Sequence, residues 1–302
     1  MICTPLSLKS VRIRASVPQC WRKPKQRHLG TQQEITMSEY SPRPNFFVRS
    51  ASYENQKITV RFDAKRRVLD VDEMPTGSPV ADSQSLASLI DSTLLKPDAT
   101  EAQISQLCQD AIQYRFFAVC INPYWVPLCA RLLAGSEVRI ATVVGFPLGA
   151  TSTGIKVFET KRLISLGADE VDMVMNIGEM KQGNLTAVAT DMREVVRAAH
   201  KRQALVKVII ETCLLSEAEK IKACLIAKEV GVDFVKTSTG FSGPGATTAD
   251  VALMRAVVGS AMGVKAAGGI RSLDEARQMV AAGASRIGTS AGVKIVSEEK
   301  AA

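Results

Sequence analysis

Two lysines lie in short apolar segments of the sequence, where a charged ammonium group is costly to bury. Lys236 stands in residues 233–240 (DFVKTSTG), and Lys265 follows 29 residues later in residues 263–269 (GVKAAGG). A buried lysine either has a charged partner or loses its proton, and a neutral lysine attacks carbonyl carbon. The two segments therefore indicate covalent carbonyl chemistry with Lys236 as the nucleophile.

From about residue 84 onward, apolar segments alternate with amphipathic ones, which is the pattern of parallel βα units. Capping boxes predict helix starts after Thr100, Ser216 and Ser272. Eight strands are predicted, at residues 88–91, 117–121, 139–144, 170–175, 205–211, 234–237, 264–267 and 286–288. The pattern predicts an α/β fold, a (β/α)8 TIM barrel over residues 84–298, with a tail at 299–302.

Three of the predicted helices end at a glycine that suits a helix C-cap. These glycines are Gly167, Gly231 and Gly283. Five residues further along, the three following strands carry Asp172, Lys236 and Gly288. Because alternate strands fill a common layer of a barrel, we expect these three residues at one level of its interior.

The proximity of two lysines and one acid would set the charge of the nucleophile. Two ammonium groups about 4 Å apart repel by roughly 4 kcal/mol at an effective dielectric near 20, which corresponds to about three pKa units. We expect Asp172 to contact mainly Lys265 and keep it charged, so that Lys265 lowers the pKa of Lys236. Other charged residues of these segments are predicted to be structural: Lys96, Lys207 and Glu211.

Composition excludes several other kinds of site. The chain has only two histidines, His28 and His200, which makes a histidine-rich metal site or a Ser-His-Asp triad improbable. Its seven cysteines form no Cys-x-x-Cys pair and are predicted to be reduced, mostly buried thiols, with Cys120 a core thiol. No apolar run is long enough to span a bilayer, so we expect a soluble, intracellular protein with no membrane partner.

Most of the net charge of +8 lies in the amino-terminal segment. Residues 1–33 carry seven lysines and arginines and no acid, so the rest of the chain is almost neutral and nucleic-acid binding is not expected. Residues 1–36 are predicted to be a largely disordered basic extension with the composition of a plastid or mitochondrial transit peptide. The alternatives are a disordered basic arm and a segment upstream of a start at Met37; without a targeting role the protein would be cytoplasmic. Residues 37–83 are predicted to be poorly ordered, or to form a small hairpin from 58–62 and 68–71 followed by a linker.

Two glycine-rich segments follow the last two predicted strands. Gly268 and Gly269 come directly after the strand with Lys265, and Gly288 and Ser290 lie at the end of the final strand. Backbone N–H groups at close glycine turns and helix starts bind phosphate, and many barrels hold phosphate at this position. A nucleoside triphosphate is not expected, because no Gly-Lys-Ser/Thr sequence ends the nearby loop at 240–245.

Seven segments, in order along residues 84–296, together resemble the deoxyribose-phosphate aldolase family of class I barrel enzymes. They are residues 90–97 (IDSTLLKP), 118–123 (AVCINP), 142–149 (TVVGFPLG), 170–176 (EVDMVMN), 208–212 (VIIET), 235–240 (VKTSTG) and 263–271 (GVKAAGGIR). The resemblance implies reversible cleavage of 2-deoxy-D-ribose 5-phosphate to D-glyceraldehyde 3-phosphate and acetaldehyde. The implied partner is a small phosphosugar, with no cofactor and no metal, and the implied assembly is a monomer or homodimer.

The resemblance also implies roles for individual residues. Lys236 matches the Schiff-base lysine, while Lys265 and Asp172 match the second lysine and the acid that move protons. Asp91 matches a supporting acid of the first strand. The segments that match the phosphate site contain Gly240, Gly268, Gly269, Gly288 and Ser290, with Arg271 nearby.

The chain departs from the family pattern in three places. Ser92 stands where many members have histidine, no tyrosine follows Tyr124 although some members place one in the carboxyl tail, and residues 1–83 have no counterpart. Tail-assisted proton transfer is therefore doubtful. Two alternatives stay open: another Schiff-base barrel of the transaldolase kind, and a phosphate-binding barrel without turnover.

Overall fold

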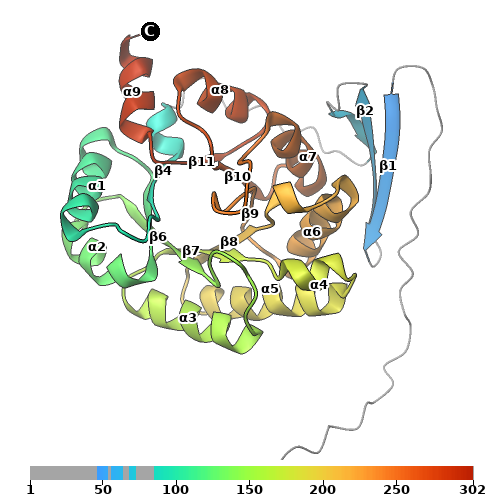
Figure 1. Cartoon of the computed structure of the whole chain (residues 1–302), viewed down its shortest axis with the longest axis horizontal. Coiled ribbons are helices and arrows are strands. Elements are labelled where there is room, and N and C mark those ends of the chain that lie inside the picture. Colours follow the sequence, from blue (N-terminus) through green and yellow to red (C-terminus); the bar gives the residue numbers. More distant parts are fainter. Residues whose placement is uncertain (1–45, 54–55, 64–67, 73–84, 302) are drawn as a thin grey trace, which may run out of the picture. The chain divides into compact units, whose positions relative to one another are not determined.

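The computed structural model describes residues 46–53, 56–63, 68–72 and 85–301. Within them, eight parallel strands follow one another around a closed barrel, and the last strand pairs with the first (Figure 1). The strands are β4 (Ile90–Leu94), β5 (Ala118–Ile121), β6 (Arg139–Val144), β7 (Glu170–Val174), β8 (Leu205–Ile209), β9 (Phe234–Lys236), β10 (Gly263–Ala267) and β11 (Arg286–Thr289). The predicted TIM barrel is confirmed.

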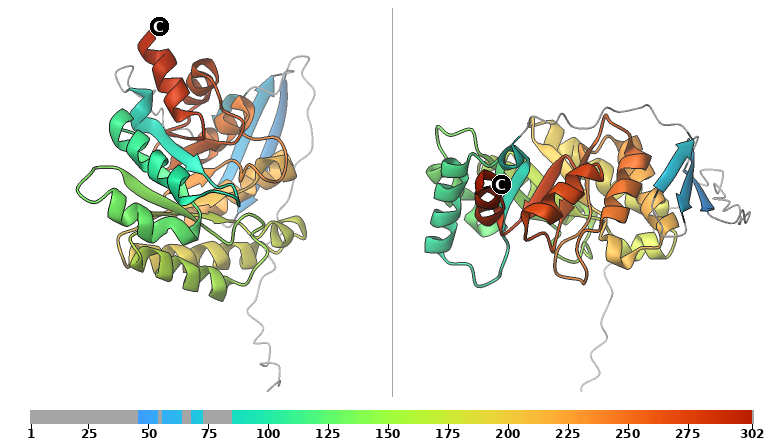
Figure 2. Two further views of the ribbon diagram at one scale, coloured as in Figure 1. Left: turned by 60° about the vertical axis from the view of Figure 1, so that its left-hand side comes forward. Right: turned by 90° about the horizontal axis from the view of Figure 1, so that it is seen from above.

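Helices connect successive strands on the outside of the barrel, as Figure 2 shows from two further sides. They are α1 (Glu101–Tyr114), α2 (Val126–Leu132), α3 (Thr153–Ser165), α4 (Ile177–Lys181), α5 (Leu185–His200), α6 (Glu217–Val230), α7 (Thr248–Val258), α8 (Leu273–Ala281) and α9 (Gly292–Ala301). Short 3-10 helices occupy Leu86–Leu89, Pro123–Trp125 and Thr212–Leu214. Helix α9 includes residues 299–301, so the predicted tail continues the last helix. None of the helices in the described part of the chain is long and apolar enough to cross a membrane.

The local signals for helix ends act as predicted. Thr100, Ser216 and Ser272 each accept a hydrogen bond from the backbone N–H three residues later, and the side chain at that position bonds back to complete a capping box. Each box satisfies two N–H groups that the first turn of a helix leaves unpaired. Gly231 ends α6 in the left-handed conformation at φ 78°, which glycine adopts without the Cβ clash of other residues.

The first strand begins later than predicted. The Ser85 side chain accepts a hydrogen bond from Ala87 N at 3.3 Å, and this cap starts the 3-10 helix Leu86–Leu89 instead of a strand. Leu86 and Leu89 are buried in that turn. Part of the apolar pattern that suggested a strand at 88–91 therefore belongs to the 3-10 helix. β4 therefore starts at Ile90.

Successive residues of the barrel strands alternate between an apolar layer and a charged interior. On β10, Val264 and Ala266 belong to the large apolar core, whereas Lys265 between them forms ion pairs inside the barrel. Seven charged side chains are buried in this way, at most 4% exposed: Asp91, Glu170, Asp172, Lys207, Lys236, Lys265 and Arg286. A barrel interior filled by so many charges must pair them, because isolated buried charges are costly.

Three further strands form a separate antiparallel sheet in the order β1 (Phe46–Tyr53), β2 (Gln56–Asp63), β3 (Val68–Asp72). β2 and β3 contain the two segments predicted to form a hairpin, and Val60 pairs with Val71. β1 was not predicted. The basic extension at 1–36 and the linker at 75–83 lie outside the described residues.

Candidate functional site

Three lysines surround the carboxylate of Asp172 inside the barrel. Asp172 Oδ2 accepts hydrogen bonds from Lys236 Nζ and Lys265 Nζ, both at 2.8 Å, and Oδ1 accepts one from Lys207 Nζ at 2.8 Å. The nitrogens of Lys236 and Lys265 are therefore at most twice 2.8 Å apart. The strand register explains this proximity, because Lys265 on β10 pairs directly with Lys236 on β9. The predicted meeting of Lys236, Lys265 and Asp172 is confirmed.

Two further acids and an arginine extend the cluster toward the amino ends of the strands. Asp91 on β4 accepts hydrogen bonds from Lys265 Nζ at 2.5 Å and from Arg286 Nη1 at 2.7 Å. Glu170 on β7 pairs with Lys207 at 2.5 Å and with Arg286 at 3.3 Å. We call these seven residues the buried charge network: Asp91, Glu170, Asp172, Lys207, Lys236, Lys265 and Arg286.

The network corrects one prediction from the sequence. Asp172 does not contact mainly Lys265; it contacts Lys207, Lys236 and Lys265 at the same distance. Lys207 is thus part of the site and not only a structural charge. The signal that identified Lys236, a lysine within a β-branched strand, applies equally to Lys207 in residues 205–210 (LVKVII).

Ion pairing keeps both aspartates charged. Burial alone would raise the pKa of Asp172, but Lys207, Lys236 and Lys265 hold that pKa well below its ordinary value. Burial likewise acts against the charge of Asp91, while Lys265, Lys207 and Arg286 lower its pKa. Asp172 is therefore an anion at neutral pH that accepts hydrogen bonds from all three lysines.

The same contacts favour the charged form of two lysines. Burial would lower the pKa of Lys265, but Asp172 and Asp91 raise it above its ordinary value. Asp172 and Glu170 raise the pKa of Lys207 in the same way against its burial. The expectation that Lys265 stays charged therefore agrees with the geometry, and Lys265 is able to donate a proton within the site.

Cys120 on β5 also faces this cluster. It is fully buried, as a core thiol would be, but its Sγ lies 4.0 Å from Asp172 Oδ2. Burial raises the pKa of the Cys120 thiol, with the nearby Asp172 and Asp91 acting in the same direction and Lys265 and Lys236 against it. Cys120 is therefore the buried, neutral thiol that was predicted, and it lies beside the lysines of the site.

Glu211, which was predicted to be a structural charge, fixes the loop that follows Lys236. Glu211 has a left-handed backbone, with φ 55°, that only a few per cent of non-glycine residues adopt. Its carboxylate accepts hydrogen bonds from the N–H and the hydroxyl of Thr239. Thr237 Oγ1 bonds Ala267 N and O, both at 3.1 Å. The chain beyond Lys236 is thereby fixed to β8 and β10. Lys96, by contrast, is exposed.

Two of the predicted phosphate segments meet at the carboxyl ends of β9 and β10. Gly240, Gly268 and Gly269 all have positive φ, between 83° and 89°. The loops approach so closely that a Cβ on Gly245 would lie 2.1 Å from Gly268 O, and Ala246 N donates to that oxygen at 3.0 Å. This pair of loops therefore requires glycine for steric reasons.

The remaining predicted phosphate residues have different surroundings. Ser290 is exposed directly after β11, and Arg271 is exposed at the start of α8, where its backbone N–H donates to Glu275 at 2.6 Å. Gly288 is buried within β11, and a Cβ there would lie 3.0 Å from Lys265 Cε. Gly288 thus leaves room for the Lys265 side chain.

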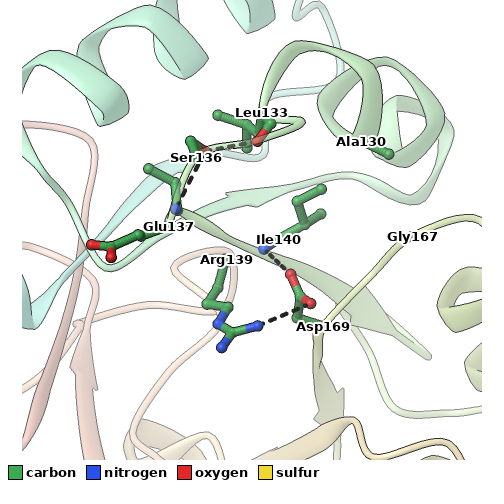
Figure 3. Close-up of a pocket in the computed structure, with 9 residues that line it drawn as sticks. Ala130, Leu133, Ser136, Glu137, Arg139, Ile140, Gly167 and Asp169 are labelled. Atoms are coloured by element: carbon green, nitrogen blue, oxygen red, sulfur yellow. Dashed lines mark hydrogen bonds and ion pairs between the residues drawn. The ribbon is translucent and has the colours of Figure 1, made fainter.

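A pocket of about 640 Å³ lies at the opposite end of the strands (Figure 3). Figure 3 shows Arg139, the first residue of β6, beside Asp169, which precedes β7; the two are paired at 3.5 Å. Asp169 also accepts a hydrogen bond from Ile140 N at 2.9 Å. Active sites of TIM barrels lie at the carboxyl ends of the strands, so this pocket is separate from the lysine cluster.

Comparison with known proteins assigns the family. A family model described as "DeoC/LacD family aldolase" matches residues 86–298. A relative from Thermococcus kodakarensis named deoxyribose-phosphate aldolase is 59% identical over 215 residues, covering 70% of this chain and 96% of the relative. One from Clostridium perfringens with the same name is 57% identical over 214 residues, covering 71% and 95%. A solved tetrameric deoxyribose phosphate aldolase from Aeropyrum pernix has a TM-score of 0.67 and 36% identity, covering 71% of this chain and 91% of that one. The chain therefore belongs to the DeoC/LacD family of aldolases.

Proposed function

We propose that the protein cleaves 2-deoxy-D-ribose 5-phosphate reversibly to D-glyceraldehyde 3-phosphate and acetaldehyde through an imine on Lys236. The observation that carries this proposal is the placement of Lys236 and Lys265 on one oxygen of Asp172, each at 2.8 Å. This arrangement joins a nucleophile, a charged proton donor and a proton acceptor within one buried site. The names of the relatives that are 57–59% identical support the choice of substrate.

The first half of the reaction forms the imine. The neutral amine of Lys236 attacks C1 of the open-chain sugar, the C1 oxygen takes up a proton, and water leaves to give a protonated imine. Lys265, which stays charged, is the group placed to supply that proton. Asp172, which stays an anion, holds Lys236 Nζ in position for the attack.

The second half breaks the carbon–carbon bond. A base removes the proton of the 3-hydroxyl, the C2–C3 electron pair moves into the imine, and glyceraldehyde 3-phosphate leaves. The enamine that remains is protonated at C2 and then hydrolysed, which releases acetaldehyde and restores Lys236. Asp172 and Lys265 exchange these protons directly or through a water, and Asp91 holds Lys265 in place at 2.5 Å.

We propose that the phosphate binds where the loops after β9, β10 and β11 come together. Backbone N–H groups of closely turned glycines and the start of α9 suit an anion there. The proposed phosphate residues are Gly240, Gly268, Gly269, Arg271, Gly288 and Ser290. Exposure of Gly240, Gly269 and Ser290 to solvent is compatible with this role.

We also propose the wider setting of the reaction. The substrate places the protein in deoxyribonucleoside and deoxyribonucleotide catabolism, acting as a monomer or homodimer. Residues 1–36 are proposed to be a plastid or mitochondrial transit peptide, with the cytoplasm as the alternative location. Mass spectrometry of the native amino terminus tests the transit peptide, because cleavage would remove this basic segment.

Cleavage of the substrate tests the proposed activity. The full chain is incubated with 2-deoxy-D-ribose 5-phosphate, and acetaldehyde is measured through its reduction by alcohol dehydrogenase and NADH. We expect turnover by the parent protein and none by Lys236→Ala. Cleavage only of sugar phosphates that yield dihydroxyacetone would favour a transaldolase-like enzyme, and cleavage of neither kind would contradict the proposal.

A further inference from the structure

The buried charge network holds one more cation than anion. It contains four cations, Lys207, Lys236, Lys265 and Arg286, and three carboxylates, Asp91, Glu170 and Asp172. No further charged side chain of the described residues forms an ion pair with any of these seven. With every lysine protonated and every carboxylate ionised, the network would bury one excess positive charge. This excess favours the loss of one proton from the network.

The contacts indicate which cation releases that proton. Lys207 lies within ion-pair distance of three carboxylates, at 2.5, 2.8 and 3.7 Å. Lys265 contacts two, at 2.5 and 2.8 Å, and Arg286 contacts two, at 2.7 and 3.3 Å. Among the described residues, Lys236 pairs with one carboxylate, that of Asp172, at 2.8 Å. Lys236 therefore has the fewest carboxylate partners of the four cations.

Arg286 is the one cation of the network that cannot release a proton. A guanidinium group remains charged in proteins. Its Cζ lies 3.5 Å from the centre of the Phe117 ring and 5.2 Å from that of Phe234, so the group is enclosed at the amino ends of the strands. Glu170 and Asp91 are its carboxylate partners. The charge of Arg286 is thus permanent and must be balanced within the network.

We propose that Arg286 and Glu170 are positioning residues that set the pH at which Lys236 becomes a nucleophile. Arg286 raises the positive charge of the network and Glu170 lowers it, and neither has to touch the substrate. This inference rests on the proposed imine chemistry of Lys236. Lys236 contacts Asp172 (β7) directly; the other titratable groups packed around that contact inside the barrel are Asp91 (β4), Cys120 (β5), Lys207 (β8) and Lys265 (β10).

Removing the charge of Arg286 and removing that of Glu170 should shift the pH dependence of imine formation in opposite directions. Arg286→Gln balances the network, so the rate of imine formation should rise only at higher pH. Glu170→Gln increases the excess positive charge, so that rate should rise at lower pH; Lys207 then still has two carboxylate partners. The Cα atoms of Arg286 and Lys236 are two strand spacings apart, about 10 Å, because both residues pair with Lys265 in the strand register. A unit charge at that distance shifts a titration by about one pH unit at an effective dielectric near 20.

The experiment measures the initial rate of borohydride-trapped imine formation with acetaldehyde on the full chain as a function of pH. We expect the midpoint of the rise in rate to move up by about one unit in Arg286→Gln and down by about one unit in Glu170→Gln. Arg286→Lys, which keeps the charge, should restore the parent midpoint. Arg139→Gln is the matched control, because it removes an exposed arginine paired with Asp169 at the same end of the barrel.

A structural role alone would lower the rate or the unfolding temperature without moving the two midpoints apart. Shifts in the same direction, or unchanged midpoints in both variants, would overturn the inference while leaving the trapped lysine intact. If Arg286→Gln does not fold, the other two variants test the inference. A downward shift of the midpoint in Glu170→Gln together with the parent midpoint in Arg286→Lys would support it, and any other pair of results would overturn it. Failure of the parent protein to form any adduct would refute the proposed function and this inference with it.

Discussion

Replacement of Gly288 by alanine tests whether this glycine serves the lysine cluster. The added Cβ would lie 3.0 Å from both Lys265 Cε and Ala267 Cβ. Two non-bonded carbon atoms attract one another at separations of about 3.5 Å or more, so both contacts would be too close. Lys265 has little freedom to retreat, because Asp91 and Asp172 hold its Nζ at 2.5 and 2.8 Å and the side chain is fully buried. We therefore expect the substitution to shift the end of the Lys265 side chain by a few tenths of an ångström.

Such a displacement should affect chemistry more than folding. A misplacement of about 1 Å can cost on the order of 100-fold in rate, so we expect kcat/KM for the phosphosugar to fall by roughly 10- to 100-fold. The free energy of unfolding should fall by only about 1 to 3 kcal/mol, the usual cost of one extra methyl group in a packed core. Steady-state kinetics and urea denaturation measure these two effects.

Imine trapping with acetaldehyde distinguishes a steric role of Gly288 toward Lys265 from a role in phosphate binding alone. Acetaldehyde carries no phosphate, so a glycine that served only the phosphate would leave imine trapping with acetaldehyde unchanged and raise KM for the phosphosugar. We expect trapping to slow together with cleavage. Gly154→Ala is the matched control, because an added Cβ there meets nothing within 4 Å. Unchanged trapping in Gly288→Ala would refute the steric argument.

Three further outcomes follow from the same contacts. Asp172→Asn keeps the side-chain shape but removes the charge that faces three lysines, so cleavage should fall by about 10²-fold or more, and a loss under fivefold in initial-rate assays would contradict its role. Lys156→Met should lower the free energy of unfolding, measured by urea denaturation, by about 3 to 5 kcal/mol, because buried Asp191, which pairs with Lys156 at 2.5 Å, would lose its cation. The double variant Lys156→Met/Asp191→Leu should recover most of that loss. Equal instability of both variants would contradict the explanation. The unfolding temperature should fall below about pH 4, where Asp91 and Asp172 protonate in the unfolded chain but not in the folded one, and above about pH 10.4, where Lys207 and Lys265 lose protons first in the unfolded chain. A flat temperature profile from pH 3 to 11 would show that the network contributes nothing to stability.

The barrel was predictable because its signals are local. Each capping box and each strand occupies a few neighbouring residues, and the three boxes form as expected. The prediction was wrong at residues 88 and 89, because Ser85 caps a 3-10 helix in an apolar segment that fits either a strand or a turn. Such short segments cannot be assigned by periodicity alone.

The site was predictable only in part because its partners meet through closure of the barrel. Lys236 and Lys265 lie on consecutive strands, so their spacing in the sequence indicates their proximity. Arg286 and Asp91 are 195 positions apart and meet only because β11 pairs with β4. Glu211 was missed for another reason, since its role depends on a left-handed backbone that its residue type does not predict.

The most direct test of the central claim is to identify the residue that carries the imine. The protein is incubated with acetaldehyde and borohydride, digested, and mapped by mass spectrometry, with Lys236→Ala as the control. The network predicts an ethyl group on Lys236, the lysine with a single carboxylate partner, and none on Lys207 or Lys265. An adduct on Lys207 or Lys265 of the parent protein, or undiminished incorporation of the two-carbon adduct into Lys236→Ala, would contradict the account.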